Sequence, residues 1–240
     1  MSYLLYCVIT SGNHSPSTNI PGVGDQPVSV VSSGELATVI SEAPELESIP
    51  VSEAGLAYHR VIAAFHKLGT VIPLRYGSYC RDIDGIINLL SQQRGLYMKL
   101  LAELNGCTEM GIRVLLPANT KYPPIVPANT STGGSGHAFL AARRAHYSHK
   151  DSISNNQGEI VERCLAALTG IVLKHNVDKS PVDASLFSIN LLVRADSVPQ
   201  VREAFSKLCT NESAKLLLSG PWPPYSFVQS GNPAVSLTES

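Results

Sequence analysis

Residues 187–218, FSINLLVRADSVPQVREAFSKLCTNESAKLLL, form the clearest supersecondary unit of the chain. Apolar residues at every second position from 187 to 193 predict a half-buried strand. Ser197 and Pro199 then open a helix with an apolar inner face, because both residue types favour the start of a helix. Residues 214–218 return as a second strand. This β-α-β unit predicts an α+β layer, with a helix packed on a sheet.

The first half of the chain also alternates short strands with amphipathic helices. Tyr3–Ile9 is an unbroken apolar run, which is typical of a central strand covered on both faces. A helix is predicted from Ser52 to Gly69, and a second helical region begins at Asp82, where Gly95 either breaks it or is tolerated. The remaining predicted strands are residues 28–31 and 36–40, which form a hairpin, and residues 70–75 and 110–116.

A stretch rich in Pro, Asn, Thr and Gly lies between residues 117 and 136 and is the best linker candidate. After it, the sequence predicts helices at about residues 137–149 and 161–172, the second with Val172 on its apolar face. We therefore predict an N-terminal α+β domain over residues 1–117, a linker over 118–135, a C-terminal α+β domain over 136–228 and a flexible tail over 229–240.

Composition excludes several classes of protein. The 240 residues carry 18 Lys+Arg against 19 Asp+Glu, so the chain lacks the basic excess of a nucleic-acid binder. The longest well-placed uncharged apolar stretch, residues 164–173, is half of the about 20 residues that a membrane helix needs. Five scattered cysteines without a C-x-x-C motif indicate buried, reduced thiols. We expect a cytoplasmic protein with no nucleic-acid partner and no lipid-membrane partner.

The common catalytic patterns are incomplete or missing, and no catalytic, cofactor or metal site is predicted. His59 and His66 lie about 10 Å apart along one helix, too far to share a metal without a third element. Asp82 and Asp84 stand at a helix start, where carboxylates stabilise the first turn.

Two segments carry more information than a generic core would require. Residues 71–77, VIPLRYG, place Arg75 at the end of an apolar strand, and a buried arginine there would need charged or carbonyl partners. Residues 218–228, LSGPWPPYSFV, hold the only Trp and three prolines within four positions, so they cannot be regular helix or central strand. Trp222 and Tyr225 either pack at a domain junction or face a partner.

These two segments resemble motifs of the gas vesicle GvpL/GvpF family: a helix with a motif His, a strand ending in Pro-Leu-Arg-Phe-Gly and a closing Gly-Pro-Trp-Pro-Pro-Tyr-x-Phe. This chain has Tyr76 where Phe is common, and it has lost the Arg of the family's Gly-Arg-Ala-Tyr-Leu, which stands here as residues 136–140, GHAFL. The resemblance covers residues 3–228. The implied structural or partner-binding residues are His59, Pro73, Leu74, Arg75, Tyr76, Gly77, Gly136, Phe139, Leu140, Gly220, Pro221, Trp222, Pro223, Pro224, Tyr225 and Phe227.

The resemblance implies an α+β fold of two domains, each a mixed sheet with packed helices and each a variant of the ferredoxin-like fold. It also implies a non-enzymatic accessory protein of gas vesicle formation, associated with the vesicle, which binds the hydrophobic shell protein GvpA and other accessory Gvp proteins. Two alternatives stay open. One is a small-molecule-binding regulatory protein with ferredoxin-like domains, in which Arg75 and His59 hold an anion. The other is an enzyme with Cys80 as its nucleophile.

Overall fold

The computed structural model describes residues 2–12, 20–43, 50–116, 156–180, 182–183, 185–210 and 214–228. The predicted linker (118–135), helix (137–149) and tail (229–240) lie outside the described residues. The chain forms two compact units that are not contiguous in sequence. The first unit comprises Met1–Met110, Leu192–Ala195 and Gly220–Ser240, and the second comprises Gly111–Leu191 and Asp196–Ser219.

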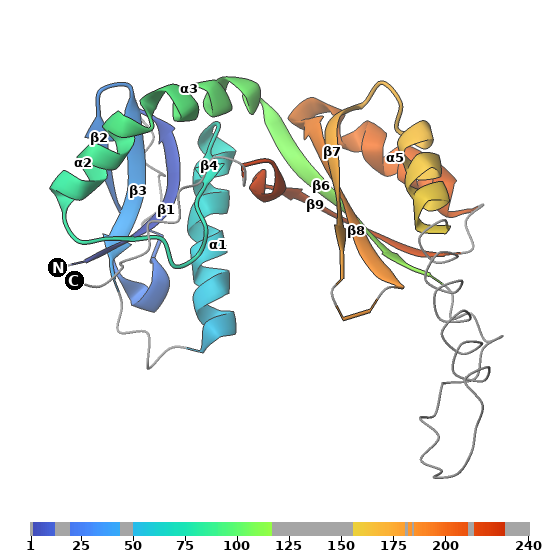
Figure 1. Ribbon diagram of the computed structural model, residues 1–240, viewed down its shortest axis with the longest axis horizontal. Helices are drawn as coiled ribbons and strands as arrows, with labels where there is room; N and C mark the ends of the chain where they lie inside the picture. Colours follow the sequence, from blue (N-terminus) through green and yellow to red (C-terminus); the bar gives the residue numbers. More distant parts are fainter. Residues whose placement is uncertain are drawn as a thin grey trace, which may run out of the picture. The chain divides into compact units, whose positions relative to one another are not determined.

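The first sheet is antiparallel in every ladder, with strand order β2-β3-β1-β4 (Figure 1). A fifth strand, β5, also pairs with β1. Its strands are β1 (Tyr3–Thr10), β2 (Ser29–Ser33), β3 (Leu36–Glu42), β4 (Ile72–Pro73) and β5 (Tyr79–Cys80). The hairpin of β2 and β3 confirms the prediction made from residues 28–40.

Helices cover both faces of this sheet, which is why β1 is apolar without alternation. Helix α1 (Val51–Leu68) packs on one face, where Tyr58, Ile62 and Phe65 join side chains of β1 and β3 in a core. Helices α2 (Ile83–Gln92) and α3 (Arg94–Glu103) pack on the other face (Figure 1). A strand that is covered on both faces needs apolar side chains at successive positions, because each position is buried on one face or the other.

The second sheet has strand order β7-β8-β6-β9. Its strands are β6 (Cys107–Leu115), β7 (Val172–Lys179), β8 (Leu186–Arg194) and β9 (Lys215–Trp222). Helix α5 (Val198–Cys209) connects β8 to β9, and these two strands lie on either side of β6. A second helix occupies residues 156–167, between β6 and β7 in the chain. Figure 1 shows both helices on the same side of this sheet.

The two sheets share one strand order, in which the second, third, first and fourth strands in the chain follow one another in space. In the second sheet this is the split β-α-β arrangement of a β-α-β-β-α-β ferredoxin-like fold. In the first sheet, α1 takes the place of α5, and the described part of the connection between β1 and β2 contains the 3-10 turn η1 (Val23–Asp25). The α+β fold class with helices packed on two sheets is confirmed. The expectation of mixed sheets was wrong for the first sheet, whose ladders are all antiparallel.

Several local expectations were wrong. The strand predicted over residues 70–75 is only the two-residue β4, with Pro73 at the outer edge of the sheet, where its missing N–H costs no ladder bond. The Leu74 N–H still donates to the Tyr6 carbonyl at 2.9 Å. Val172 begins β7 and does not belong to the preceding helix. This strand went unrecognised because its side chains are mostly exposed, so they show no apolar alternation. Gly95 is tolerated inside α3, and the break between α2 and α3 falls at Gln93.

The cysteines agree with the prediction in four positions and differ in one. Cys7, Cys80, Cys107 and Cys164 are buried free thiols, whereas Cys209 is exposed at the end of α5. No helix within the described ranges has the length and apolarity that crossing a membrane requires.

Asp82 caps helix α2, as the sequence predicted, and this gives a test of the local structure. Its carboxylate accepts the backbone N–H of Gly85 at 2.7 Å. Asp82→Ala should lower the free energy of unfolding by about 1 kcal/mol, because the N–H then lacks its acceptor. Asp84→Ala, two residues later in the first turn, should lower the free energy of unfolding by only a few tenths of a kcal/mol, through the helix dipole. Urea denaturation compares the two, and equal losses would show that the cap contributes nothing specific.

Candidate functional site

The closing motif of the chain is built into the first unit. Strand β9 ends at Trp222, a 3-10 turn η4 spans Tyr225–Phe227, and Val228 follows with 4% exposure. Val228 belongs to the same buried cluster as Leu5 and Val8 of the central strand β1. The segment 220–228 therefore packs as part of the core, more than 100 residues after β6 in the chain.

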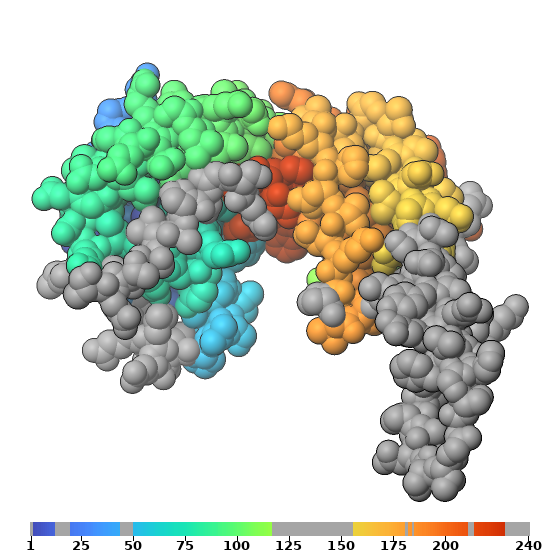
Figure 2. Space-filling model, in the orientation of Figure 1, coloured from blue at the N-terminus to red at the C-terminus, as the bar shows by residue number. Residues whose placement is uncertain are grey.

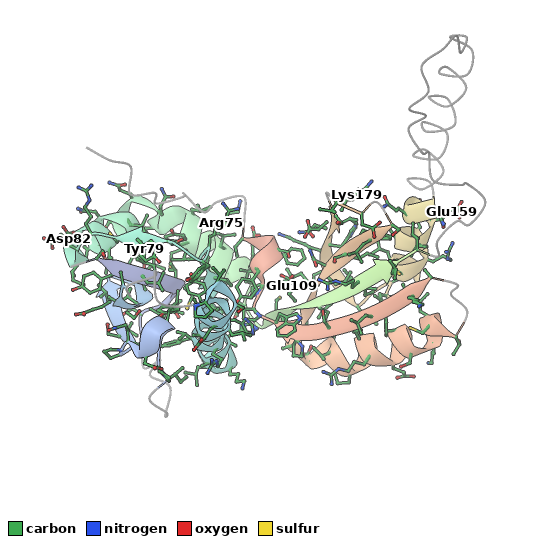
Figure 3. All side chains as sticks on the ribbon, turned by 90° about the horizontal axis from the view of Figure 1, so that it is seen from below. Arg75, Tyr79, Asp82, Glu109, Glu159 and Lys179 are labelled. Atoms are coloured by element: carbon green, nitrogen blue, oxygen red, sulfur yellow. The ribbon has the colours of Figure 1, made fainter. Side chains whose placement is uncertain are left out.

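A buried carboxylate on β6 holds this segment. Glu109 is only 7% exposed, and it accepts both the backbone N–H of Ser226 and the Ser226 hydroxyl, each at 2.8 Å. The neighbouring Thr108 hydroxyl donates to the carbonyl of Trp222 at 2.9 Å. Figure 3 shows Glu109 beside the closing segment. Because a buried charge is costly unless hydrogen bonds satisfy it, these contacts define where the segment lies.

His59 of α1 also contacts this segment. Its Nδ1 lies 2.8 Å from the Tyr225 hydroxyl, and its ring meets the Trp222 ring edge-on with centroids 5.3 Å apart. The His59 and Tyr225 rings are 5.9 Å apart and tilted. The motif histidine and the motif aromatics thus form one cluster.

Tyr58, the residue before His59, holds the other motif. Its hydroxyl donates to the Leu5 carbonyl at 2.7 Å, and the carbonyls of Leu74 and Arg75 lie 3.1 and 3.2 Å from the same oxygen. The Tyr58 ring stacks on Tyr6 at 4.9 Å and meets Tyr76 edge-on at 5.2 Å. The end of β4 is therefore fastened to β1 through α1.

Burial keeps these groups neutral. It raises the pKa of the Tyr58 and Tyr225 hydroxyls well above the ordinary value of 10.0, with smaller contributions from nearby thiol, phenol and carboxyl groups. Burial also lowers the pKa of His59 and His66 below 6.5. The hydrogen bond between His59 and Tyr225, and those from the Tyr58 hydroxyl to backbone carbonyls, therefore join uncharged groups.

Arg75 does not have the buried environment that its sequence context suggested. Its side chain is exposed and points outward (Figure 3), and its guanidinium has no hydrogen bond or ion pair with any described residue. The backbone is nevertheless held, because the Arg75 carbonyl accepts the Ser78 N–H at 3.0 Å and the Ser78 hydroxyl at 2.7 Å. Gly77, with φ of 88°, provides the left-handed conformation that this turn requires.

The closing motif combines a buried backbone with one exposed aromatic. Gly220 has φ of 110°, and a Cβ there would lie 2.8 Å from the Glu109 carbonyl oxygen, so only glycine fits. Pro223 and Pro224 are buried. Trp222 rests on His59 with one ring edge yet is 41% exposed. Trp222 therefore packs in part within the first unit, and its contact with a partner stays a prediction.

The structure brings together His59, residues 73–77 and residues 220–227, whereas Gly136, Phe139 and Leu140 lie outside the described residues. Sequence reasoning missed Glu109 and Ser226, although a lone acid inside an apolar strand was a usable signal. Among the described residues, no group of three or more His, Cys, Asp or Glu side chains could hold a metal ion. Cys80 is 8% exposed, which does not favour a reacting thiol.

Comparison with known proteins gives a consistent result. The family model described as "Gas vesicle synthesis protein GvpL/GvpF" matches residues 2–229. The chain is 26% identical to gas vesicle protein F of Streptomyces sp. (strain CB03234), covering 95% of this chain and all of the relative. It is also 26% identical to gas vesicle protein L of the same organism, covering 86% of this chain and 85% of the relative.

Solved structures agree with the fold. The crystal structure of the gas vesicle protein GvpF from Anabaena sp. PCC7120 aligns with a TM-score of 0.75 at 14% identity, covering 95% of this chain and 98% of that one.

The bond between Glu109 and Ser226 can be measured by a double-mutant cycle. Ser226→Ala should lower the free energy of unfolding by about 1.5–3 kcal/mol, the range for a hydrogen bond to a charged group. Glu109→Gln should cost at least as much, and the double variant should cost less than the sum. Ser206→Ala, an exposed serine of α5, is the control and should change stability by less than about 0.5 kcal/mol. Additive losses would contradict the pairing.

The lowered pKa of His59 and His66 predicts a loss of stability in acid. A group whose folded-state pKa is depressed contributes its full stability above its unfolded pKa of about 6.5 and loses it as the pH falls through the folded value. The melting temperature should therefore decrease as the pH is lowered below about 6.5. In the double variant His59→Asn/His66→Asn, the melting temperature should depend less on pH in this range. His175→Asn, at an exposed position of β7, is the control, and an unchanged slope in the double variant would contradict the assignment.

Proposed function

This chain belongs to the gas vesicle synthesis protein GvpL/GvpF family, and from that membership we propose that it is a non-enzymatic accessory protein of gas vesicle formation. It binds the hydrophobic shell protein GvpA and other accessory Gvp proteins during assembly or nucleation. The observation that carries this proposal is the family match over residues 2–229, which includes both motifs of the candidate site.

The arrangement of the site supports a binding role. The hydroxyls of Tyr58 and Tyr225 and the carboxylate of Glu109 are engaged in hydrogen bonds that hold the unit together. The side chains of Arg75 and Trp222 remain exposed on a backbone that is fixed by those contacts. Arginine and tryptophan are the side chains most often found at the energetic centre of protein interfaces. We therefore assign partner contact to these two side chains.

The composition is compatible with handling a hydrophobic partner in the cytoplasm at the vesicle. A net charge of −1 produces little long-range repulsion or attraction, so contact depends on local apolar and hydrogen-bonding surfaces. The alternative role as a small-molecule-binding regulator stays a prediction, and a ligand-dependent rise in melting temperature would favour it.

Co-purification from cells that express the whole gene cluster tests the proposal. The tagged wild-type chain should retain GvpA above an unrelated tagged control. Arg75→Met and Trp222→Ala should each reduce retention, and Arg75→Met should leave the free energy of unfolding within about 0.5 kcal/mol of wild type because its guanidinium is exposed.

Matched variants separate contact from folding. Arg202→Met removes another exposed arginine, on α5, and should leave retention unchanged. Trp222→Phe retains an aromatic ring and should bind better than Trp222→Ala. A wild-type chain that folds but retains no GvpA would overturn GvpA as the partner.

A further inference from the structure

Strand β2 is an outer edge of the first sheet with an open backbone. Among the described strands it pairs with β3 alone (Figure 1). Ser33 and Leu36 are paired across the two-residue turn of Gly34 and Glu35. Residues that flank such a turn exchange both hydrogen bonds, and successive pairs alternate. The backbone N–H and C=O groups of Val30 and Ser32 therefore point away from β3.

The other sheet edges carry features that discourage a further strand. β4 is two residues long and contains Pro73. β7 carries the charged residues Lys174, Asp178 and Lys179, and β9 carries Lys215 and Pro221. Natural proteins protect open edges with such short strands, charges and prolines. β2, with the sequence SVVSS, has none of these, so its edge is the unprotected one among the described strands.

Aliphatic side chains flank this edge on both faces of the sheet. Ser33 lies against Ser91 of α2, with their hydroxyl oxygens 3.3 Å apart, which places α2 beside β2. Ile87 lies one turn before Ser91 on the same helix and is 36% exposed. Val30, whose neighbour Val31 packs toward the α2 side, faces the opposite side of the sheet and is 39% exposed. Figure 2 shows atoms of the hairpin, in blue, at the surface beside those of α2, in green.

We propose that the β2 edge accepts an extended, uncharged, aliphatic segment of a partner protein as an added strand. The open groups of Val30 and Ser32 supply main-chain hydrogen bonds, and Val30 and Ile87 contact the partner's side chains. The partner is expected to be uncharged because residues 27–33 carry no charge that would pair with one. The proposal rests on the proposed function, in which the hydrophobic shell protein is the partner of this chemistry.

A second copy of the chain fits the edge less well. A five-residue strand spans about 17 Å, which is short for the roughly 800 Å² per partner that a stable dimer buries. Strand addition by an extended segment needs less area, because each added residue contributes main-chain hydrogen bonds along the edge.

Substitution of Val30 in the full-length chain tests the proposal. Val30→Lys places a charge at the docking edge, as protected natural edges do, and should reduce the retention of GvpA about tenfold. Val30→Thr is the matched control, because it retains a β-branched, uncharged side chain and should retain GvpA within about twofold. Leu217→Lys, at an exposed position of β9, controls for the added charge alone. Melting curves should be alike, since Val30 is at an exposed edge position.

Hydrogen exchange of the complex supplies an independent readout. The amides of Val30 and Ser32 should exchange more slowly when GvpA is bound, because their open N–H groups then have acceptors. If the wild type and Val30→Lys retain GvpA equally, the docking edge is wrong while the proposed function stands. If the wild type retains no GvpA, the proposed function and the docking edge fail together. A wild-type dimer that Val30→Lys converts to a monomer would assign the edge to a second copy and overturn the proposal.

Discussion

The hydrogen-bonded carboxylate of Glu109 is the constraint on which the first unit depends. It is almost fully buried, and an ion in that position destabilises the fold unless donors surround it. The donors that the structure provides include the backbone and hydroxyl of Ser226, 117 positions further along the chain. Residues 220–228 must therefore return to the first unit, and the core near β1 is completed only when they do.

Adjacent residues of one helix join the two family motifs. Successive residues on a helix point about 100° apart, so Tyr58 and His59 face different neighbours. Tyr58 reaches the carbonyls at the end of β4, and His59 reaches Tyr225 and Trp222 of the closing segment. This joint fixes the backbone around Arg75 and Trp222 while their side chains remain exposed. A rigid backbone with exposed side chains is what a binding surface requires, because little conformational entropy is then lost on contact.

Because both sheets are open and share one strand order, each has two edge strands with backbone groups that face away from the sheet. Three of these edges are short, charged or contain proline, and β2 is none of these. The uncharged, proline-free sequence of β2 would indicate nothing about binding if the strand were considered alone. It becomes informative because the topology shows which strands are at an edge, and because α2 places Ile87 beside β2.

The sequence by itself determined the local elements and the family. The apolar run at Tyr3–Ile9, the hairpin, the β8-α5-β9 unit and the Asp82 cap all follow from side chains acting on near neighbours. The two motifs are enough to indicate the family. Only the tertiary structure decided the pairing of Glu109 with Ser226, the exposure of Arg75, the polar edge strand β7 and the open edge of β2. The physical reason is that hydrogen-bond satisfaction and burial depend on groups far apart in the chain, and no local periodicity records which distant group will supply the partner.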